Sequence, residues 1–221
     1  MSHIILLGDS IFDNAAYVRG GPDVVRQLRE VVPVNWKASL LAVDGAVTRN
    51  VPSQLARLPA DATHLVLSVG GNDALGASFV LDQNVRTVAE AVSLLEVAQH
   101  RFATEYEAAI DQLLARALPA AVCTIYDTPP SDPNQRIIRT ALSVFNDVIT
   151  RAAFRRGLPL IDLRLICNED EDYANPIEPS VQGGAKMAAA IASLAAAPEA
   201  DWHRSLVVAD GTMPRPHMSR S

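Results

Sequence analysis

The segment Ile4-Ile5-Leu6-Leu7-Gly8-Asp9-Ser10 is an apolar run that ends in a polar turn containing glycine. Further along the chain, Leu65-Val66-Leu67-Ser68-Val69-Gly70-Gly71-Asn72-Asp73 has the same form. Short runs that are apolar almost throughout are typical of strands covered on both faces, as in a parallel sheet. We therefore predict two parallel strands that deliver polar side chains to the same edge of one sheet.

Strand-like and helix-like stretches alternate along most of the chain, which indicates βαβ units and an α/β fold. Strands are predicted over 3–7, 38–43, 64–69, 120–126 and 158–163. Helices are predicted over 22–31, 52–58, 84–118, 136–156 and 181–194, and a break of the long helix near His100 stays open. Ligands of such folds bind beyond the carboxyl ends of the strands, where all the polar turns fall.

The length of 221 residues suits one α/β domain, which we assign to residues 1–200. Residues 201–221 are predicted to form a C-terminal tail that is poorly ordered in part, with a short strand at 206–208. Apolar residues make up 49% of the chain and aromatic residues only 5%, so the core must be mainly aliphatic.

The net charge of −6 disfavours nucleic acid as a partner. The two cysteines, Cys123 and Cys167, form no zinc motif, so no metal is predicted, although a disulfide between them stays open. The glycines of 70–76 lack phosphate-loop spacing, so no nucleotide or other cofactor is predicted. The first apolar run is too short for a signal peptide and no apolar stretch is long enough to cross a membrane, so we expect a cytoplasmic protein. The sequence leaves the oligomeric state open.

Three of the turns carry groups that suit acyl transfer. Ser10 directly follows a strand and could expose its hydroxyl and its backbone N–H, or simply cap the next helix. Gly45 could present a backbone N–H to a ligand, or form a plain turn. The Asn72 amide could donate to a developing oxyanion, or belong to a turn.

Together these stretches resemble the SGNH (GDSL-type) hydrolase family. Gly8-Asp9-Ser10 matches its nucleophile block, Gly45 the glycine of its second block and Gly70-Gly71-Asn72-Asp73 its Gly-x-Asn-Asp block. The resemblance covers about residues 3–195 and implies a flavodoxin-like, three-layer α/β sandwich of about five parallel strands. It also implies hydrolysis of esters or acetyl groups, with Ser10 as nucleophile. The oxyanion hole would consist of the Ser10 N–H, the Gly45 N–H and the Asn72 amide.

The last block departs from the family pattern. The family has Asp-x-x-His-Pro at this point, whereas this chain reads Asn175-Pro176-Ile177-Glu178-Pro179. Glu178 therefore stands in the place of the histidine, and Asn175 in the place of the aspartate that would orient it. Both halves of the usual base pair are replaced together, which is self-consistent because an absent imidazole needs no orienting carboxylate.

No histidine offers an obvious substitute. Two of the five histidines begin strands and so lie at the opposite edge of the sheet, one lies in the long helix and two lie in the tail. They are His3, His64, His100, His203 and His217. Only His203 is considered as a group that could swing in.

Glu178 could act as the base if its environment strengthens it. A free glutamate has a pKa near 4.3 and a free histidine a pKa near 6.5, and burial beside Ile177 and Pro179 would close part of that gap. The first hypothesis is therefore a serine hydrolase for a small-molecule ester, with a Ser10–Glu178 dyad. The alternative is a weak or inactive binding module for an acylated or sugar ligand, in which Glu178 is a solvated carboxylate.

Several further carboxylates are candidates for the substrate pocket: Asp9, Asp13, Asp73 and Asp127. Asp13 could line the pocket or cap a helix, and we favour the cap. The acidic run 169–172 is expected to be a solvated loop, in which Asp172 is the one member that could approach Glu178 and raise its pKa.

Overall fold

The computed structural model describes residues 2–197 and 207–208. Six strands form one parallel sheet in the order β2-β1-β3-β4-β5-β8. They are β1 (His3–Gly8), β2 (Lys37–Leu40), β3 (His64–Ser68), β4 (Ala120–Cys123), β5 (Leu160–Ile161) and β8 (Val207–Val208). A separate antiparallel hairpin pairs β6 (Tyr173–Asn175) with β7 (Glu178–Pro179).

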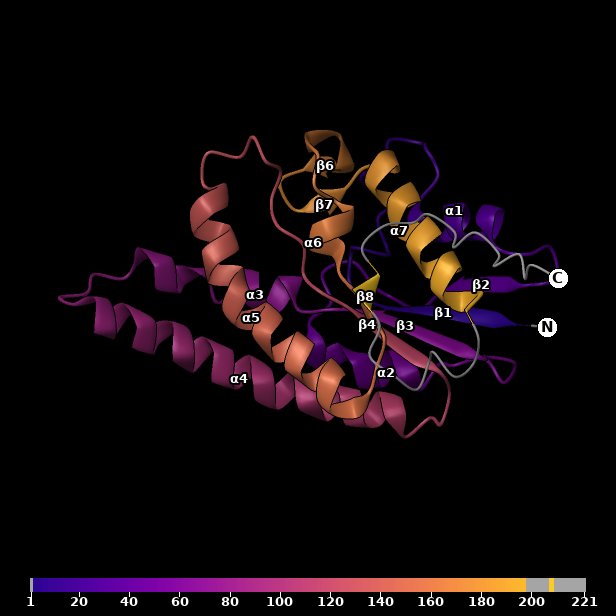
Figure 1. Cartoon of the computed structure of the whole chain (residues 1–221), viewed down its shortest axis with the longest axis horizontal. Coiled ribbons are helices and arrows are strands. Elements are labelled where there is room, and N and C mark those ends of the chain that lie inside the picture. Colours follow the sequence, from indigo (N-terminus) through magenta and orange to yellow (C-terminus); the bar gives the residue numbers. More distant parts are fainter. Residues whose placement is uncertain (1, 198–206, 209–221) are drawn as a thin grey trace, which may run out of the picture.

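Helices cover both faces of the sheet, which gives the predicted three-layer sandwich (Figure 1). The α-helices are α1 (Val24–Val31), α2 (Val51–Leu55), α3 (Gly71–Gly76), α4 (Val88–Leu114), α5 (Gln135–Arg156), α6 (Leu163–Ile166) and α7 (Val181–Ala195). Three short 3-10 helices are η1 (Thr48–Asn50), η2 (Ser78–Asp82) and η3 (Asp170–Asp172). Because alternate residues of a strand point to opposite faces, Ile4 and Leu6 pack with α1 and α7, whereas Ile5 and Leu7 pack with α2, α4 and α5.

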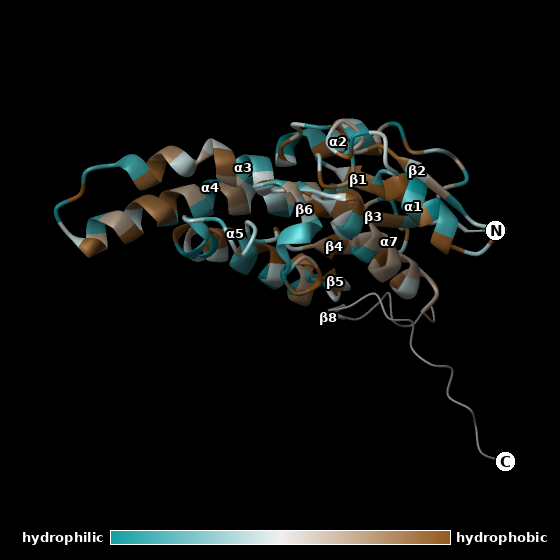
Figure 2. Ribbon diagram, turned by 90° about the horizontal axis from the view of Figure 1, so that it is seen from above, coloured by the Kyte–Doolittle hydropathy of each residue, from teal (hydrophilic) through white to brown (hydrophobic). Residues whose placement is uncertain are grey.

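Local signals fix where the main helices begin and end. Asp23 and Ser180 cap α1 and α7, since each side chain accepts a hydrogen bond from a backbone N–H of the first turn. Gly157 ends α5 in the left-handed conformation, with φ +64°. α4 and α5 lie side by side, and both run past the edge of the sheet (Figures 1 and 2).

The predicted strands and long helices are all present. The strands β2 to β5 and α4 are shorter than predicted, whereas β1, α5 and α7 each extend one residue further. The stretch 70–73, predicted as a turn, instead begins α3 with Gly70 as its N-cap. α4 is continuous through His100, and the hairpin of β6 and β7 was not predicted. Strand β8 lies within the short strand predicted at 206–208 and pairs with β5. The other residues of 201–221 lie outside the described residues.

The structure answers the question of a disulfide, which the sequence left open, for the part of the chain that is described. Cys123 and Cys167 are both free thiols in the core, so they form no disulfide. None of the described helices combines the length and the apolar character needed to cross a membrane.

The turn after β1 is held in place by a close approach of backbone. Gly8 has φ +123°, and a Cβ added there would lie 1.7 Å from the carbonyl oxygen of Ser68 on the neighbouring strand. The buried Gln54 side chain clamps Gly8 from the other side. Its Oε1 accepts from the Gly8 N–H at 2.8 Å, and its Nε2 donates to the Gly8 carbonyl at 2.7 Å. The residues that follow Gly8 therefore leave the sheet in one fixed direction.

We predict that Gly8→Ala lowers the free energy of unfolding by at least about 3 kcal/mol, because the methyl group would overlap backbone that cannot move away. Gly20→Ala is the matched control. Gly20 also has a positive φ (+87°) but has nothing within 4 Å of the added Cβ, so it should cost only about 1–2 kcal/mol. Urea unfolding of both variants measures the difference, and equal losses would contradict the assigned contact.

Candidate active site

The structure brings Ser10 and Glu178 together at the carboxyl ends of the strands, although 167 residues separate them. Ser10 follows β1 and is 6% exposed, and Glu178 begins β7 and is 5% exposed. The Ser10 side chain lies close enough to the Glu178 carboxyl to lower its pKa. Both residues line one cavity. The expectation that Glu178 is a solvated loop carboxylate is therefore wrong.

Burial dominates the electrostatics of Glu178. It raises the pKa of this carboxyl to about 7, the negative charge of Asp44 adds to the rise, and the Ser10 side chain opposes it. The second carboxylate oxygen, Oε2, is buried and has no hydrogen-bond partner among the described residues. This oxygen therefore lacks the donors that would stabilise a negative charge on it.

The segment that carries Glu178 is anchored through its backbone. Asn14 donates from Nδ2 to the Pro179 carbonyl at 3.2 Å, while its Oδ1 accepts from the Val24 N–H at the start of α1. The Tyr126 hydroxyl donates to the Ile177 carbonyl at 3.0 Å. These contacts flank Glu178 on both sides and position its side chain.

Asn175, predicted to stand in the place of the family's aspartate, forms a local hydrogen bond. Its Oδ1 accepts a hydrogen bond from the Ile177 N–H at 3.0 Å, which closes a turn between β6 and β7. Its backbone pairs with Glu178 in the hairpin. The residue thus shapes the turn that presents Glu178.

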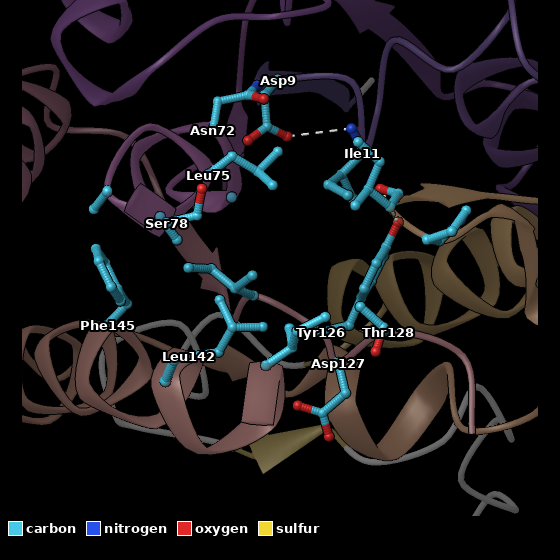
Figure 3. A pocket seen from close by; sticks show the side chains of 18 of the residues that line it. Asp9, Ile11, Asn72, Leu75, Ser78, Tyr126, Asp127, Thr128, Leu142 and Phe145 are labelled. Atoms are coloured by element: carbon cyan, nitrogen blue, oxygen red, sulfur yellow. Dashed lines mark hydrogen bonds between the residues drawn. The ribbon is translucent and has the colours of Figure 1, made fainter. Parts of the chain in front are cut away.

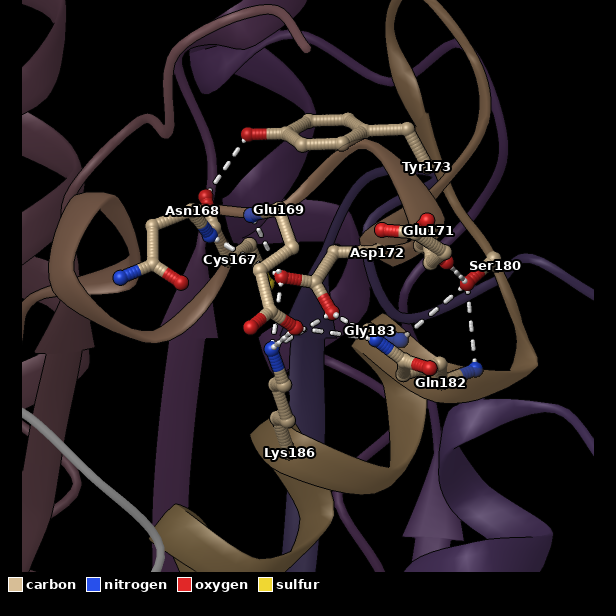
Figure 4. A network of polar contacts seen from close by, with 10 residues as sticks. All are labelled: Cys167, Asn168, Glu169, Glu171, Asp172, Tyr173, Ser180, Gln182, Gly183 and Lys186. Carbon is tan, nitrogen blue, oxygen red and sulfur yellow. Dashed lines mark hydrogen bonds and ion pairs between the residues drawn. The ribbon is translucent and has the colours of Figure 1, made fainter. Parts of the chain in front are cut away.

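Asp172 lies in a separate network, so the prediction that it could approach Glu178 is wrong (Figure 4). It is fully buried, and its carboxylate accepts hydrogen bonds from the backbone N–H groups of Asn168 and Glu169 at 3.0 Å. Gln182 and Lys186 of α7 supply the remaining donors, with the Lys186 ammonium at 2.8 Å. This network attaches the segment before the hairpin to α7.

The predicted oxyanion donors come from three elements. Within the described residues, the backbone N–H groups of Ser10 and Gly45 have no hydrogen-bond acceptor. Gly45 is the third residue of a β-turn and has φ +75°, the conformation for which type II turns select glycine. Asn72 donates one amide proton to the Ala46 carbonyl at 2.9 Å, which ties α3 to that turn. Its second amide proton is available, and Asn72 lines the cavity.

Asp9 adds a second buried carboxyl to the site. Its Oδ1 accepts from the Ile11 N–H at 3.2 Å, the contact drawn in Figure 3. Burial raises the pKa of Asp9 to about 8, and the negative charges of Glu178 and Asp73 contribute to the rise. At neutral pH Asp9 is therefore mainly protonated.

The three other carboxylates predicted for the pocket lie in different places. Asp127 lines the cavity, and burial raises the pKa of its carboxyl. Asp73 lines a neighbouring cavity and accepts two hydrogen bonds from Thr48, each at 3.0 Å. Asp13 was expected to cap a helix, but its carboxylate accepts from the Asp44 N–H at 2.9 Å in the loop that precedes Gly45.

No histidine of the described part of the chain lines the cavity. His3 is held by Asp61 and Ser39, each at 2.8 Å, at the amino-terminal edge of the sheet. His64 begins β3 and His100 lies on α4. His203, considered as a group that could swing in, lies outside the described residues.

A family model settles the family. The model of the GDSL-like lipase/acylhydrolase family matches residues 6–204, nearly the whole chain. The chain belongs to this family. Hydrolases of this family act on esters, and a small-molecule ester is the corresponding kind of substrate. No curated protein matches the chain significantly.

Solved structures show that this GDSL-like protein shares the fold of esterases and lipases. An extracellular lipase from Streptomyces rimosus is 17% identical, with a TM-score of 0.58 over 83% of this chain and 95% of the lipase. An acetyl xylan esterase, AlAXEase, is 17% identical with a TM-score of 0.62 over 84% and 96%. The aryl esterase of M. smegmatis is 16% identical with a TM-score of 0.57 over 87% and 97%. At these identities the likeness concerns the fold alone.

Three residues of this GDSL-like protein support the site and were missed by sequence reasoning. Gln54 clamps the turn before Ser10, while Asn14 and Tyr126 hold the backbone around Glu178. A polar residue in an apolar context was the only available signal for Gln54.

We predict that Glu178→Gln stabilises the protein at about pH 8.5, by roughly 1–3 kcal/mol, and has a much smaller effect near pH 5. The pKa of Glu178 is about 7 in the folded protein and near its ordinary value of 4.5 when unfolded. Above pH 7 the wild type must therefore hold a buried charge that glutamine lacks, whereas below about pH 5 the folded carboxyl is already neutral. Thermal unfolding at both pH values measures this. An equal shift at the two values would contradict a buried, ionising Glu178.

Proposed function

We propose that this protein is a serine esterase in which Ser10 attacks the ester and Glu178 accepts the serine proton directly. The observation that carries the proposal is that Ser10 and Glu178, both buried, line the same cavity, and burial raises the pKa of the Glu178 carboxyl to about 7. A base with a pKa near the working pH is the most effective kind in general base catalysis.

In the first half-reaction, Glu178 takes the Oγ proton while Ser10 Oγ bonds to the ester carbonyl carbon. The resulting oxyanion is stabilised by the Ser10 N–H, the Gly45 N–H and the available Asn72 amide proton. When the tetrahedral intermediate collapses, the bond to the alcohol oxygen breaks and protonated Glu178 returns its proton to that oxygen. Water then hydrolyses the acyl-enzyme with the same base, which regenerates Ser10.

The raised pKa compensates for the lack of an imidazole. An ordinary glutamate is a weaker base than histidine by about 2 pKa units, or about 3 kcal/mol of proton affinity. A pKa of about 7 removes that deficit. Because a carboxylate presents two oxygens and has no tautomers, it needs no second carboxylate to orient it, which agrees with asparagine at position 175.

We expect the wild type to hydrolyse p-nitrophenyl butyrate and to be labelled by a fluorophosphonate probe. Ser10→Ala should abolish both, because it removes the nucleophile. Glu178→Gln should lower kcat by about 10²–10⁴-fold, the usual contribution of a general base. Glu96→Gln is the control, since Glu96 is an exposed residue of α4 that lines neither cavity. Equal rates in all four proteins would reject the proposal.

The dependence of kcat/KM on pH should be bell-shaped. Activity should rise as Glu178 loses its proton near pH 7, because only the carboxylate accepts a proton. It should fall as Asp9 ionises near pH 8, because a negative charge beside Ser10 opposes formation of the oxyanion. Asp44 and Asp73 are the other carboxylates that act on these two groups. In Asp9→Asn the alkaline limb should disappear, and its persistence would contradict this assignment.

The absence of histidine from the described lining of the cavity favours a second candidate, a binding module with little or no catalysis. A silent wild type that gains strong esterase activity on Glu178→His with Asn175→Asp would support this candidate. A wild type that is already active supports the dyad. A cytoplasmic location stays a prediction from the sequence.

A further inference from the structure

The cavity at Ser10 has a few polar residues in its lining but mainly apolar walls. Its volume is about 210 Å³. Ser10, Asp9 and Glu178 belong to its lining. Its walls are built mainly from aliphatic and aromatic side chains of α3, η2, α4 and α5, among them Leu75, Leu142 and Phe145 (Figure 3). The wall residues include Leu75, Val80, Leu81, Leu95, Leu142 and Phe145. The charged residues of the lining are Asp9, Asp127 and Glu178, and α3, η2, α4 and α5 contribute none. The space between these helices is therefore suited to an uncharged, apolar occupant.

Apolar side chains on the inner face of α4 continue past the edge of the sheet. Phe102 and Tyr106 on its inner face are buried in the core. Leu95, Val92 and Val88 continue the same helical spacing toward the amino-terminal end. Val92 and Val88 are 58% and 81% exposed, because that end of α4 extends past the sheet (Figure 1). The inner face of α4 thus offers apolar surface that the described part of the chain leaves uncovered.

The direction of a bound ester follows from the proton transfers. Glu178 must reach both the Ser10 proton and the departing alcohol oxygen, so the alcohol lies on the side of Glu178. The acyl group then points away from Glu178, past Asn72. Asn72 is in the first turn of α3, and the residues that follow it along α3 and η2 form the apolar wall.

We propose that the cavity between α3, η2, α4 and α5 binds the unbranched acyl chain of the substrate, which makes esters of medium-chain and longer fatty acids the substrate class in preference to acetate esters. This inference rests on the proposed function. Each methylene that enters the cavity is removed from water, which contributes about fourfold to the affinity for the chain.

The wild type should show kcat/KM roughly tenfold higher for p-nitrophenyl butyrate than for the acetate, and higher again for the octanoate. A value that falls from acetate to octanoate would overturn the inference and leave the proposed function intact. Failure of every ester together with no fluorophosphonate labelling would instead count against the proposed function. A series of alkyl acetates tests the orientation: chain-length dependence there, and not among the p-nitrophenyl esters, would overturn the acyl assignment.

Variants on α5 test whether the acyl chain binds in this cavity. Ala141 lines the cavity and Thr140 is its exposed neighbour on the same helix. Ala141→Phe should lower the ratio of octanoate to acetate activity by tenfold or more, whereas Thr140→Phe should leave that ratio unchanged. Ala98→Leu on α4 tests the same wall, with the exposed Ala89→Leu as its control, in case Ala141→Phe fails to fold. Unchanged ratios in both cavity variants would overturn the location.

Binding provides a readout that needs no turnover. Octanoate should raise the thermal unfolding temperature of Ser10→Ala, and acetate at the same concentration should leave it unchanged. In the double variant Ser10→Ala with Ala141→Phe, the shift caused by octanoate should be smaller. An equal shift with acetate and octanoate would contradict an apolar chain site.

Discussion

The chemistry that we propose for this protein depends on the burial of the Glu178 carboxyl beside Ser10. Removing a carboxylate from water disfavours its charged form and thereby raises its affinity for a proton. The residues that hold Glu178 in place leave its raised pKa intact. Asn14 donates to the Pro179 carbonyl and Tyr126 to the Ile177 carbonyl, and neither donates to the carboxylate itself. The side chain is fixed in place while its charge stays poorly stabilised, which is the condition for a base. Donors aimed at the carboxylate would have held it equally well but would have lowered its pKa.

Asp172, which lies just before the hairpin of β6 and β7, is also a buried carboxylate, but unlike Glu178 it is surrounded by hydrogen-bond donors. Two backbone N–H groups, Gln182 and Lys186 satisfy it, so its negative charge is compensated in the folded protein (Figure 4). A Cβ at Gly183 would lie 2.2 Å from the Asp172 carbonyl, so glycine is required where α7 passes this segment. One carboxylate thus attaches the hairpin to the core of the fold, and the other remains free to exchange a proton.

The sequence predicted the sheet and the long helices because continuous apolar runs and helical spacing are properties of single segments. It misjudged the stretch 70–73, because Gly, Asn and Asp favour a turn and a helix start alike. The contacts of Asp73 with Thr48 and of Asn72 with Ala46, which hold α3 in place, join distant parts of the chain. The hairpin of β6 and β7 was also missed, since strands of two or three residues show no periodicity. The meeting of Ser10 and Glu178 was expected only through the family resemblance.

Asn175 shows why the two replacements in the last block belong together. An aspartate at this position would add a negative charge to the residue that pairs with Glu178 in the hairpin. That charge would raise the pKa of a buried carboxyl further, and a base with too high a pKa stays protonated at neutral pH. Asparagine keeps the hydrogen bond to the Ile177 N–H that forms the turn and contributes no charge. If Glu178 is the base, as we propose, a neutral residue at 175 keeps its pKa near 7, where it can both accept and return a proton.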